Sequence, residues 1–176
     1  KETSGLLMVA TTLESHTDLV RQLQSRTVSR RYIAIAWGRV PTQVIRGAIA
    51  RDPRDRLKMA VMTGPNAKPA VTHVTANQCV NFHEAPISLI TCRLETGRTH
   101  QIRVHFSALR HPLVGDLTYG ADHTISDRLE INRPWLHARE LTFRHPGSGK
   151  QVSFVSEYPA DLTRSLNILA QNPRGN

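Results

Sequence analysis

The densest group of polar side chains in this sequence lies between Leu94 and His105, in the stretch Leu-Glu-Thr-Gly-Arg-Thr-His-Gln-Ile-Arg-Val-His. The first half is typical of a turn, and the second half is typical of the start of a helix. Free backbone N–H groups at a helix N-terminus favour an anion, and Arg98 and Arg103 add two guanidinium groups suited to phosphate or carboxylate. This stretch is the best candidate for a functional site.

A helix after Thr99 must set the position of Arg103. Thr99 is a residue type that caps helices, and Ile102, Phe106 and Leu109 then recur at helical spacing on one apolar face. The helix therefore holds Arg103 beside the core rather than in open water. Spacing alone leaves two roles open for its guanidinium group, which are a functional one and a structural tie to a neighbouring acidic residue.

Tyr32 lies in a segment whose alternation predicts a strand from Arg31 to Val40. In that strand it shares a face with Ala34 and Ala36, and these small side chains leave room beside the ring for a flat ligand such as a nucleobase. An ordinary half-buried tyrosine would give the same pattern, because aromatic residues are common in strands. The pattern alone favours this second interpretation.

Other kinds of chemistry find little support in the sequence. The histidines near the polar stretch do not follow a His-Glu-x-x-His pattern, so we expect no metal site. Cys79 and Cys92 are isolated from each other, which argues against a disulfide framework and fits a reducing, cytoplasmic setting. The segment from Gly115 to Gly120 lacks the lysine and the preceding strand of a phosphate-binding P-loop.

The charge of the chain points to a polyanionic partner. Its 176 residues carry 23 Lys and Arg against 14 Asp and Glu, for a formal net charge of +9. Charge alone fits nucleic acid, anionic lipid or simple solubility, so it needs a site to give it meaning. No apolar stretch approaches the ~20 residues that a membrane-spanning helix needs. One basic loop between short strands is expected to be exposed, and its charged residues are Arg51, Arg54, Arg56 and Lys58.

The overall pattern predicts a single mixed α+β domain, with a mainly antiparallel sheet and interspersed helices. Strands outnumber helices, and the two do not alternate regularly as they do in doubly wound parallel sheets. A hairpin connection is expected at His83–Pro86, and a capping box at Ser15–Asp18 is expected to open the first helix. The expected strands cover residues 6–11, 31–40, 71–80, 87–94, 136–143 and 151–155, and a last helix is expected from about Asp161.

Four motifs follow one another along the chain, and they are Lys1–Leu7, Arg31–Ala34, Leu94–His105 and His111–Gly120. In this order they resemble the motifs of the RluA family of RNA pseudouridine synthases. Three further stretches, Lys58–Val61, Ala70–His73 and Leu136–Ala138, are similar to the RluD branch, which modifies large-subunit ribosomal RNA. The resemblance implies the pseudouridine synthase catalytic fold and the isomerisation of uridine to pseudouridine without a cofactor.

The essential residue of this family is an aspartate in the pattern Arg-Leu-Asp-Lys-x-Thr-Ser-Gly, and the present sequence starts at the lysine of that pattern. The resemblance therefore implies a catalytic aspartate immediately before Lys1, and residues 1–176 are expected to be a catalytic domain that lacks its N-terminal part. Glu2 and Asp116 are unconvincing substitutes for it. An S4-like RNA-binding domain often precedes the catalytic domain in the RluD branch.

Roles for several residues follow from the same resemblance. Tyr32 is expected to stack on the target base and to help remove its C5 proton, and Arg103 to pair with the catalytic aspartate. Arg98, His100 and Gln101 match the rest of the motif, where contact with the flipped nucleotide and support of the site both stay open. Extrusion of a base from folded RNA costs a few kcal/mol, which contacts to phosphate must offset. We therefore predict that the basic loop of Arg51, Arg54, Arg56 and Lys58 contacts the RNA.

The leading interpretation is therefore a monomeric, cytoplasmic isomerase that binds ribosomal RNA. The alternative is an RNA-binding module that has lost catalysis together with the aspartate. A structural ribosome-associated protein also explains the charge, but it gives no reason for the tyrosine face or for a guanidinium group beside the core.

Overall fold

The structure is a computed structural model that describes residues 2–171. The helices are α1 (Leu13–Gln24), α2 (Gln101–Ala108), α3 (His123–Arg128) and α4 (Ala160–Gln171), with a short 3-10 turn, η1 (Leu117–Tyr119). The strands are β1 (Ser4–Gly5), β2 (Ser29–Trp37), β3 (Gln43–Arg46), β4 (Ile49–Arg51), β5 (Met59–Val61), β6 (Val71–Phe82), β7 (Ala85–Leu94), β8 (Leu136–Arg144) and β9 (Gln151–Val155).

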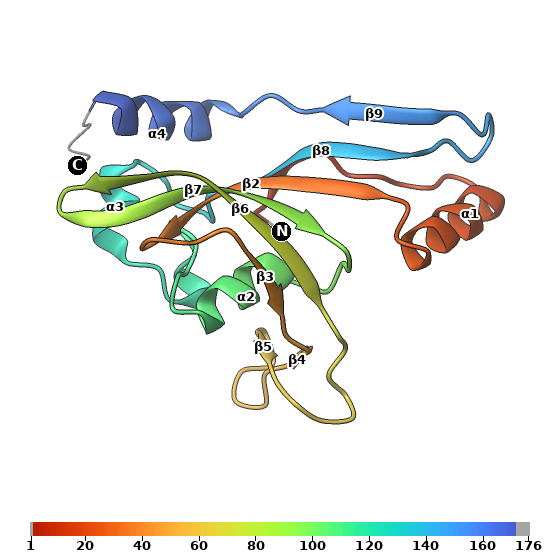
Figure 1. Ribbon diagram of the computed structural model, residues 1–176, viewed down its shortest axis with the longest axis horizontal. Coiled ribbons are helices and arrows are strands. Elements are labelled where there is room, and N and C mark those ends of the chain that lie inside the picture. Colours follow the sequence, from red (N-terminus) through yellow and green to blue (C-terminus); the bar gives the residue numbers. More distant parts are fainter. Residues whose placement is uncertain (1, 172–176) are drawn as a thin grey trace.

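A single large sheet organises the described part of the chain (Figure 1). Its strands follow the order β1-β8-β2-β7-β6-β3, and β9 pairs with β8 beside β1. Among these strands only β1 runs parallel to its neighbour, and the other pairs are antiparallel. The hairpin of β4 and β5 forms a separate two-stranded sheet that projects below the large one. The predicted α+β class with a mainly antiparallel sheet is confirmed.

The large sheet separates two parts of the core, because successive side chains of a strand point to opposite faces. On one face, Ala34 and Ala36 of β2 pack in a cluster with Ile102 and Phe106 of α2. On the other face, Ile35 packs in a cluster to which α3 and α4 contribute. Helix α2 therefore lies against the face that the small alanine side chains leave shallow.

The strand predicted at residues 6–11 is wrong, because only Ser4–Gly5 pairs with β8. Beyond Ala138 the same edge of β8 is occupied by β9, which pairs from Glu140 onward, so the segment finds no free edge. Leu7 is 85% exposed as a result. Gly5 is required where the chain does pair, since its φ is +98° and a Cβ atom there would overlap the carbonyl group of Ala138.

One helix begins earlier than predicted, and another helix was not predicted. Helix α1 begins before the predicted capping box, because the side chain of Thr12 accepts a hydrogen bond from the Ser15 backbone N–H. Helix α3 was not predicted, since six residues are too few to show a helical period. Its N-cap is Asp122, whose side chain accepts from the Thr124 backbone N–H.

The other predicted elements are confirmed with small shifts of their ends. Strands β6 and β7 form the expected antiparallel hairpin, but its turn is only two residues long. His83 and Glu84 both have positive φ, at 47° and 68°, as a tight type I′ turn requires. Strands β2, β8 and β9 and helix α4 lie where they were expected. No helix within residues 2–171 is both long enough and apolar enough to cross a membrane.

Candidate active site

Arg103 is a buried cation on α2, and its side chain is 5% exposed. Its Nε and Nη2 atoms donate to the two carboxylate oxygens of Asp116, each at 2.7 Å, and the Asp116 side chain is fully buried. The guanidinium group also lies over the ring of Tyr119, 4.9 Å from its centroid. A bidentate pair of this kind fixes the plane of the guanidinium group. The structural tie that the sequence left open therefore exists, and its partner is Asp116.

One nitrogen of Arg103 remains unused by this pair. The Nη1 atom makes no hydrogen bond to any of residues 2–171. Burial alone would lower the pKa of the guanidinium group, but the hydrogen bonds and the charge of Asp116 outweigh burial and raise it. Tyr119 and Glu2 raise the same pKa further.

Tyr119 connects the start of α2 to the projecting hairpin. Its hydroxyl oxygen accepts a hydrogen bond from the Met59 backbone N–H at 3.0 Å, and it shares a second with Nδ1 of His100 at 2.9 Å. His100 occupies the N-cap position of α2 in the left-handed conformation, with φ 55°, so the cap predicted at Thr99 is wrong. Burial lowers the pKa of His100, and the nearby charge of Arg103 lowers it further, which favours the neutral ring.

Gln101 holds the turn that precedes α2. Its Oε1 atom accepts from the Thr96 hydroxyl at 2.7 Å and from the Arg98 backbone N–H at 3.0 Å. Its Nε2 atom donates to the Val71 carbonyl and to the Thr72 hydroxyl, both at 3.0 Å. The residue is 2% exposed. Of the two roles left open for Gln101, these contacts are those of support.

Tyr32 lies on β2, on the sheet face that carries α2, and packs partly buried against the cluster of Ala34 and Phe106. Burial raises the pKa of its phenol, and the positive charge of Arg30 opposes part of that effect. The hydroxyl group has no hydrogen-bond partner among the described residues. The ring is therefore uncharged at neutral pH and free to meet a ligand on the same side of the sheet as Arg103.

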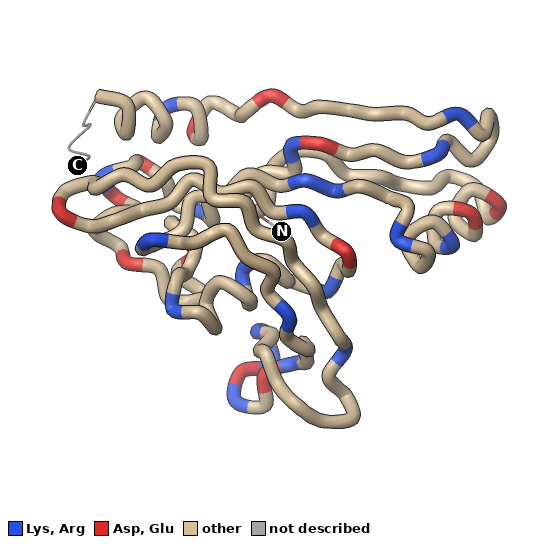
Figure 2. Tube along the Cα trace, in the orientation of Figure 1, with Lys and Arg blue, Asp and Glu red and all other residues tan. Residues whose placement is uncertain are grey.

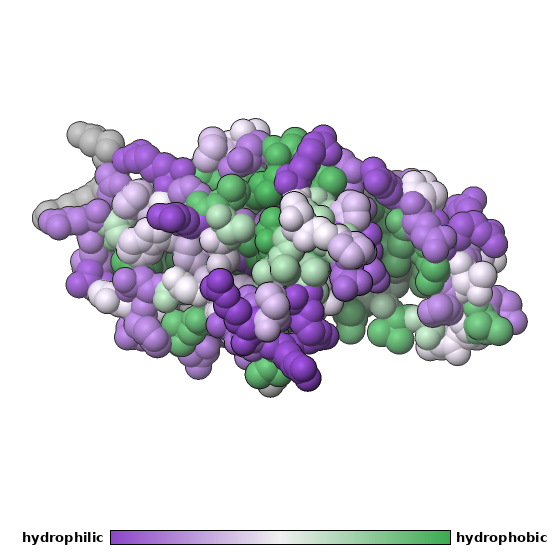
Figure 3. Space-filling model, turned by 90° about the horizontal axis from the view of Figure 1, so that it is seen from below, coloured by the Kyte–Doolittle hydropathy of each residue, from purple (hydrophilic) through white to green (hydrophobic). Residues whose placement is uncertain are grey.

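The predicted basic loop forms the connection between β4 and β5. Arg51, Arg54 and Arg56 are exposed and Lys58 is partly exposed, and Figure 2 shows their charges gathered at the tip of the hairpin with two acidic residues between them. Seen from below, on the α2 side, the hairpin region is hydrophilic (Figure 3). Arg98 is also exposed, and its Nε atom donates to the Pro69 carbonyl at 3.2 Å. Positive charge thus extends from the turn before α2 to the hairpin.

The parts that Asp116 and Tyr119 play in this site are not predicted by the sequence pattern. Both belong to the fourth motif, His111–Gly120, so the signal was present, but a Gly-Asp turn also has an ordinary structural explanation. Only the fold shows that the turn packs on Arg103. Throughout residues 2–171, no three His, Cys, Asp or Glu side chains come together in a way that could hold a metal ion.

Comparison with known proteins identifies relatives of this chain. Residues 1–108 match the family described as RNA pseudouridylate synthase. The chain is 48% identical over 177 residues to the ribosomal large subunit pseudouridine synthase D of Neisseria meningitidis serogroup B, covering 96% of this chain and 46% of the relative. It is 44% identical over 174 residues to the protein of the same name from Zymomonas mobilis, covering 96% and 54%. The chain thus spans about half the length of these relatives.

A solved structure agrees with these matches. Human RNA Pseudouridylate Synthase Domain Containing 1 superimposes with a TM-score of 0.73 at 32% sequence identity, covering 90% of this chain and 66% of the human one. The similarity therefore extends over nine tenths of this chain, in fold as well as in sequence. On the sequence match and the shared fold together, this chain belongs to the RNA pseudouridylate synthase family.

Proposed function

We propose that this chain forms the greater part of a catalytic domain that converts uridine to pseudouridine in large-subunit ribosomal RNA. The nucleophile is an aspartate immediately before Lys1, and Tyr32 and Arg103 assist it. In the reaction the N1–C1′ bond of uridine breaks, the uracil turns over, a C5–C1′ bond forms, and the proton of C5 is lost while N1 regains one. Atoms balance without a cofactor.

The observation that best supports this proposal is the partly unpaired guanidinium group of Arg103. A buried guanidinium group held by two nitrogens on Asp116, with Nη1 unpaired among residues 2–171, is suited to receive a second carboxylate. Because Glu2 contributes to the raised pKa of Arg103, we place the aspartate two residues earlier against its Nη1 atom. Its carboxylate would stay ionised beside the cation, as attack on C1′ requires.

Tyr32 supplies the base-binding surface in this proposal. Its ring lies next to the buried Ala34, and stacking of a base on an aromatic ring contributes about 1–3 kcal/mol. Because burial raises the pKa of its phenol, the ring stays neutral and does not repel the phosphates of the RNA. The hydroxyl group lacks a partner in the described part of the chain and is therefore available to help remove the C5 proton.

The positive charge of the chain and its similarity to two named relatives support ribosomal RNA as the substrate. The net charge of +9 and the exposed arginines of the β4–β5 hairpin suit a folded polyanion. The two relatives above carry names that state a ribosomal large-subunit substrate. Exposed Arg98 and partly exposed His100 lie in the turn and at the N-cap that precede Arg103 on α2, where we place contacts to the flipped nucleotide or its phosphates.

The experiment begins with the intact mass of the natural protein, followed by a pseudouridine assay on large-subunit ribosomal RNA. We expect a chain longer than 176 residues, whose turnover disappears when the aspartate before Lys1 becomes Ala. Tyr32→Phe keeps the stacking ring and should bind RNA normally while it forms product at least about tenfold more slowly. Tyr158→Phe, the same change on the opposite sheet face, is the control.

Two outcomes would contradict the proposal. Product formation by a chain that begins at Lys1 would show that the nucleophile is assigned wrongly. Tight RNA binding without any turnover by the natural protein would instead support the binding module that has lost catalysis.

A further inference from the structure

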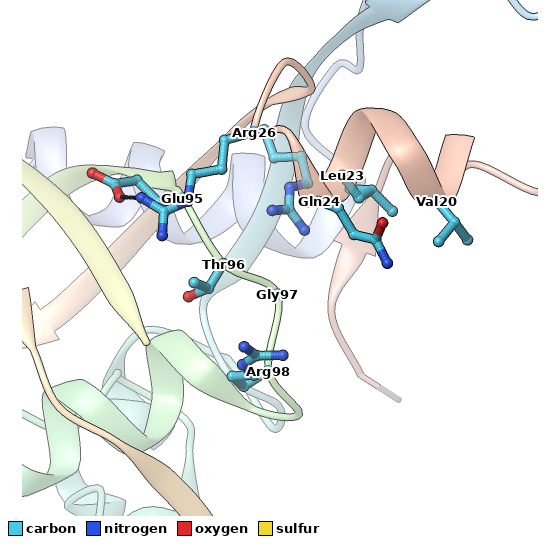
Figure 4. Close-up of a pocket in the computed structure, with 9 residues that line it drawn as sticks. Val20, Leu23, Gln24, Arg26, Glu95, Thr96, Gly97 and Arg98 are labelled. Carbon is cyan, nitrogen blue, oxygen red and sulfur yellow. Dashed lines mark hydrogen bonds and ion pairs between the residues drawn. The ribbon is translucent and has the colours of Figure 1, made fainter. Parts of the chain in front are cut away.

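A second basic depression lies beside the candidate active site, between the end of α1 and the turn that precedes α2 (Figure 4). Its volume is about 400 Å³, and three arginines contribute to its lining, which are Arg26, Arg30 and Arg98. Figure 4 shows the helix with Gln24 on one side of the pocket and the turn with Gly97 on the other. A pocket with this composition suits an anion.

The charges of the pocket do not cancel. Its acidic residue, Glu95, already accepts hydrogen bonds from Arg26 at 2.8 Å and from His73 at 2.5 Å. Arg30 and Arg98 form no ion pair with any carboxylate of residues 2–171. Two guanidinium groups in the pocket are thus left for an external anion.

Arg30 has an unmet requirement that an anion would satisfy. Its Nε atom is buried and makes no hydrogen bond, and it is the one side-chain nitrogen or oxygen in this condition among the described residues. Its guanidinium group packs directly on the backbone of Gly97, where a Cβ atom would overlap Nη1. Burial lowers the pKa of Arg30, which reflects the cost of holding this cation out of water. An unpaired buried donor of this kind calls for a partner that the protein does not itself supply.

Position along β2 connects the pocket with the target base. Arg30 and Tyr32 are two residues apart on β2, about 7 Å along the strand. The pairing of β2 with β8 is irregular between Arg31 and Tyr32, but Arg30 packs on Gly97 in the turn before α2 and Tyr32 packs in the cluster that α2 covers. The two side chains are close enough that each shifts the pKa of the other. A nucleotide next to a base stacked on Tyr32 would therefore reach the pocket.

We propose that this pocket binds the phosphate of a nucleotide that flanks the target uridine, with Arg30 and Arg98 as its ligands. The inference rests on the proposed function, since it takes RNA as the substrate and Tyr32 as the place of the target base. It gives Arg30 a role in RNA positioning, and it makes the Glu95–Arg98 turn the connection between that phosphate and α2.

A charge placed at the edge of the pocket tests this inference without disturbing its buried residues. Gln24 is exposed at the end of α1 and lines the pocket. In the full-length natural protein, Gln24→Glu should weaken binding of the RNA substrate roughly fivefold at low salt, and Gln24→Lys should strengthen it by a similar factor. Gln171→Glu and Gln171→Lys make the same changes on the exposed end of α4, on the opposite sheet face, and should leave binding unchanged.

Neutral linkages in the RNA identify the phosphate itself. One methylphosphonate is placed at each linkage near the target uridine in turn, and binding is measured for the natural protein and for Arg30→Gln, with the fold of the variant checked by circular dichroism. We expect one linkage at which a neutral phosphate weakens RNA binding by the natural protein. At that linkage the affinity of Arg30→Gln should be the same with a charged and with a neutral phosphate. Arg98→Gln should behave in the same way at the same linkage.

The outcomes separate this inference from the proposed function. If the natural protein forms pseudouridine but neither variant is coupled to any linkage, or if Gln24→Glu and Gln24→Lys shift binding in the same direction, the pocket inference is wrong and the function stands. If no pseudouridine forms while the coupling is present, the function is wrong and the pocket remains a phosphate site. Should Arg30→Gln fail to fold, the Gln24 pair and Arg98→Gln decide.

Discussion

Asp116 is the counterion of Arg103, the buried cation that α2 holds against the core. Without it, the guanidinium group of Arg103 would be a charge held out of water with no counterion among the described residues. A buried pair of this kind adds little stability over two apolar residues, but removal of one partner is costly. We therefore infer that the pair is maintained for the orientation of Arg103 rather than for net stability.

Removal of the Asp116 carboxylate tests how much Arg103 depends on its counterion. Asp116→Ala should lower the free energy of unfolding by about 3–5 kcal/mol, because it leaves Arg103 buried and unpaired. Glu140→Ala removes the partner of Arg31 in an ion pair whose two side chains are about half exposed, and it should cost about 0–1 kcal/mol. Urea unfolding followed by circular dichroism measures both values. Equal, small losses in the two variants would show that water reaches Arg103.

The β4–β5 hairpin is attached to the site at its base and carries positive charge at its tip. Its attachment depends on Met59, whose backbone N–H donates to Tyr119 beside Arg103, and on the small cluster of Ile49, Val104 and Tyr119. The charged tip projects away from that cluster (Figure 2). The hairpin therefore holds positive charge at a fixed place relative to α2.

Charge reversal tests the hairpin as an RNA-binding element. Replacement of the four basic residues Arg51, Arg54, Arg56 and Lys58 by Glu should weaken RNA binding at least about a hundredfold at low salt. The slope of log affinity against log salt concentration should become shallower by about 0.7 for each phosphate that the variant protein does not neutralise. Filter-binding titrations at several salt concentrations measure both quantities. A matched control reverses four charges elsewhere, at Arg128, Arg144, Lys150 and Arg164, and an unchanged affinity and slope in the hairpin variant would refute this role.

Most elements could be predicted from the sequence because their patterns are local. The alternation in β2, the hairpin of β6 and β7, and the placement of β8 and β9 needed no tertiary information. The strand predicted at residues 6–11 failed because the competition of β9 for the edge of β8 is not a local property. At the site, Arg103 was predicted beside the core, but its partner Asp116 follows from how the η1 turn packs, which no spacing reveals.

At the scale of the whole molecule, two buried histidines make folding sensitive to acid. The Nε2 atom of His105 donates to the Gly47 carbonyl at 3.2 Å, so in the neutral ring the Nδ1 atom accepts from the Thr72 hydroxyl at 3.0 Å. Burial lowers the pKa of His105 and likewise that of His137 below the ordinary value of 6.5. Both rings are therefore neutral in the folded protein at pH values where they would be charged in the unfolded chain.

The lowered pKa values of these two histidines determine the direction in which stability changes with pH. Below pH 6.5 the unfolded chain binds protons that the folded chain does not, so the free energy of unfolding should fall as the pH falls. Above pH 6.5 the two histidines are neutral in both states, and their contribution to stability is complete. Urea midpoints between about pH 8 and pH 5 measure the change. His105→Asn should make the dependence shallower, whereas Gln171→Asn on α4, which removes no titratable group, should not alter it. A steeper dependence in His105→Asn would contradict this account.

The pairing of β1 with β8 affects the order in which the chain folds. Ser4 and His137 are hydrogen-bonded at 2.9 Å although 133 positions separate them in the chain, so the loop that they close contains most of the molecule. Contacts of such high sequence separation form late, because the entropy of closing the loop must be offset by structure already made. During synthesis, β1 reaches its place in the sheet only after β8 has left the ribosome. A nascent chain therefore carries an unfinished site until nearly the whole of this domain has been made.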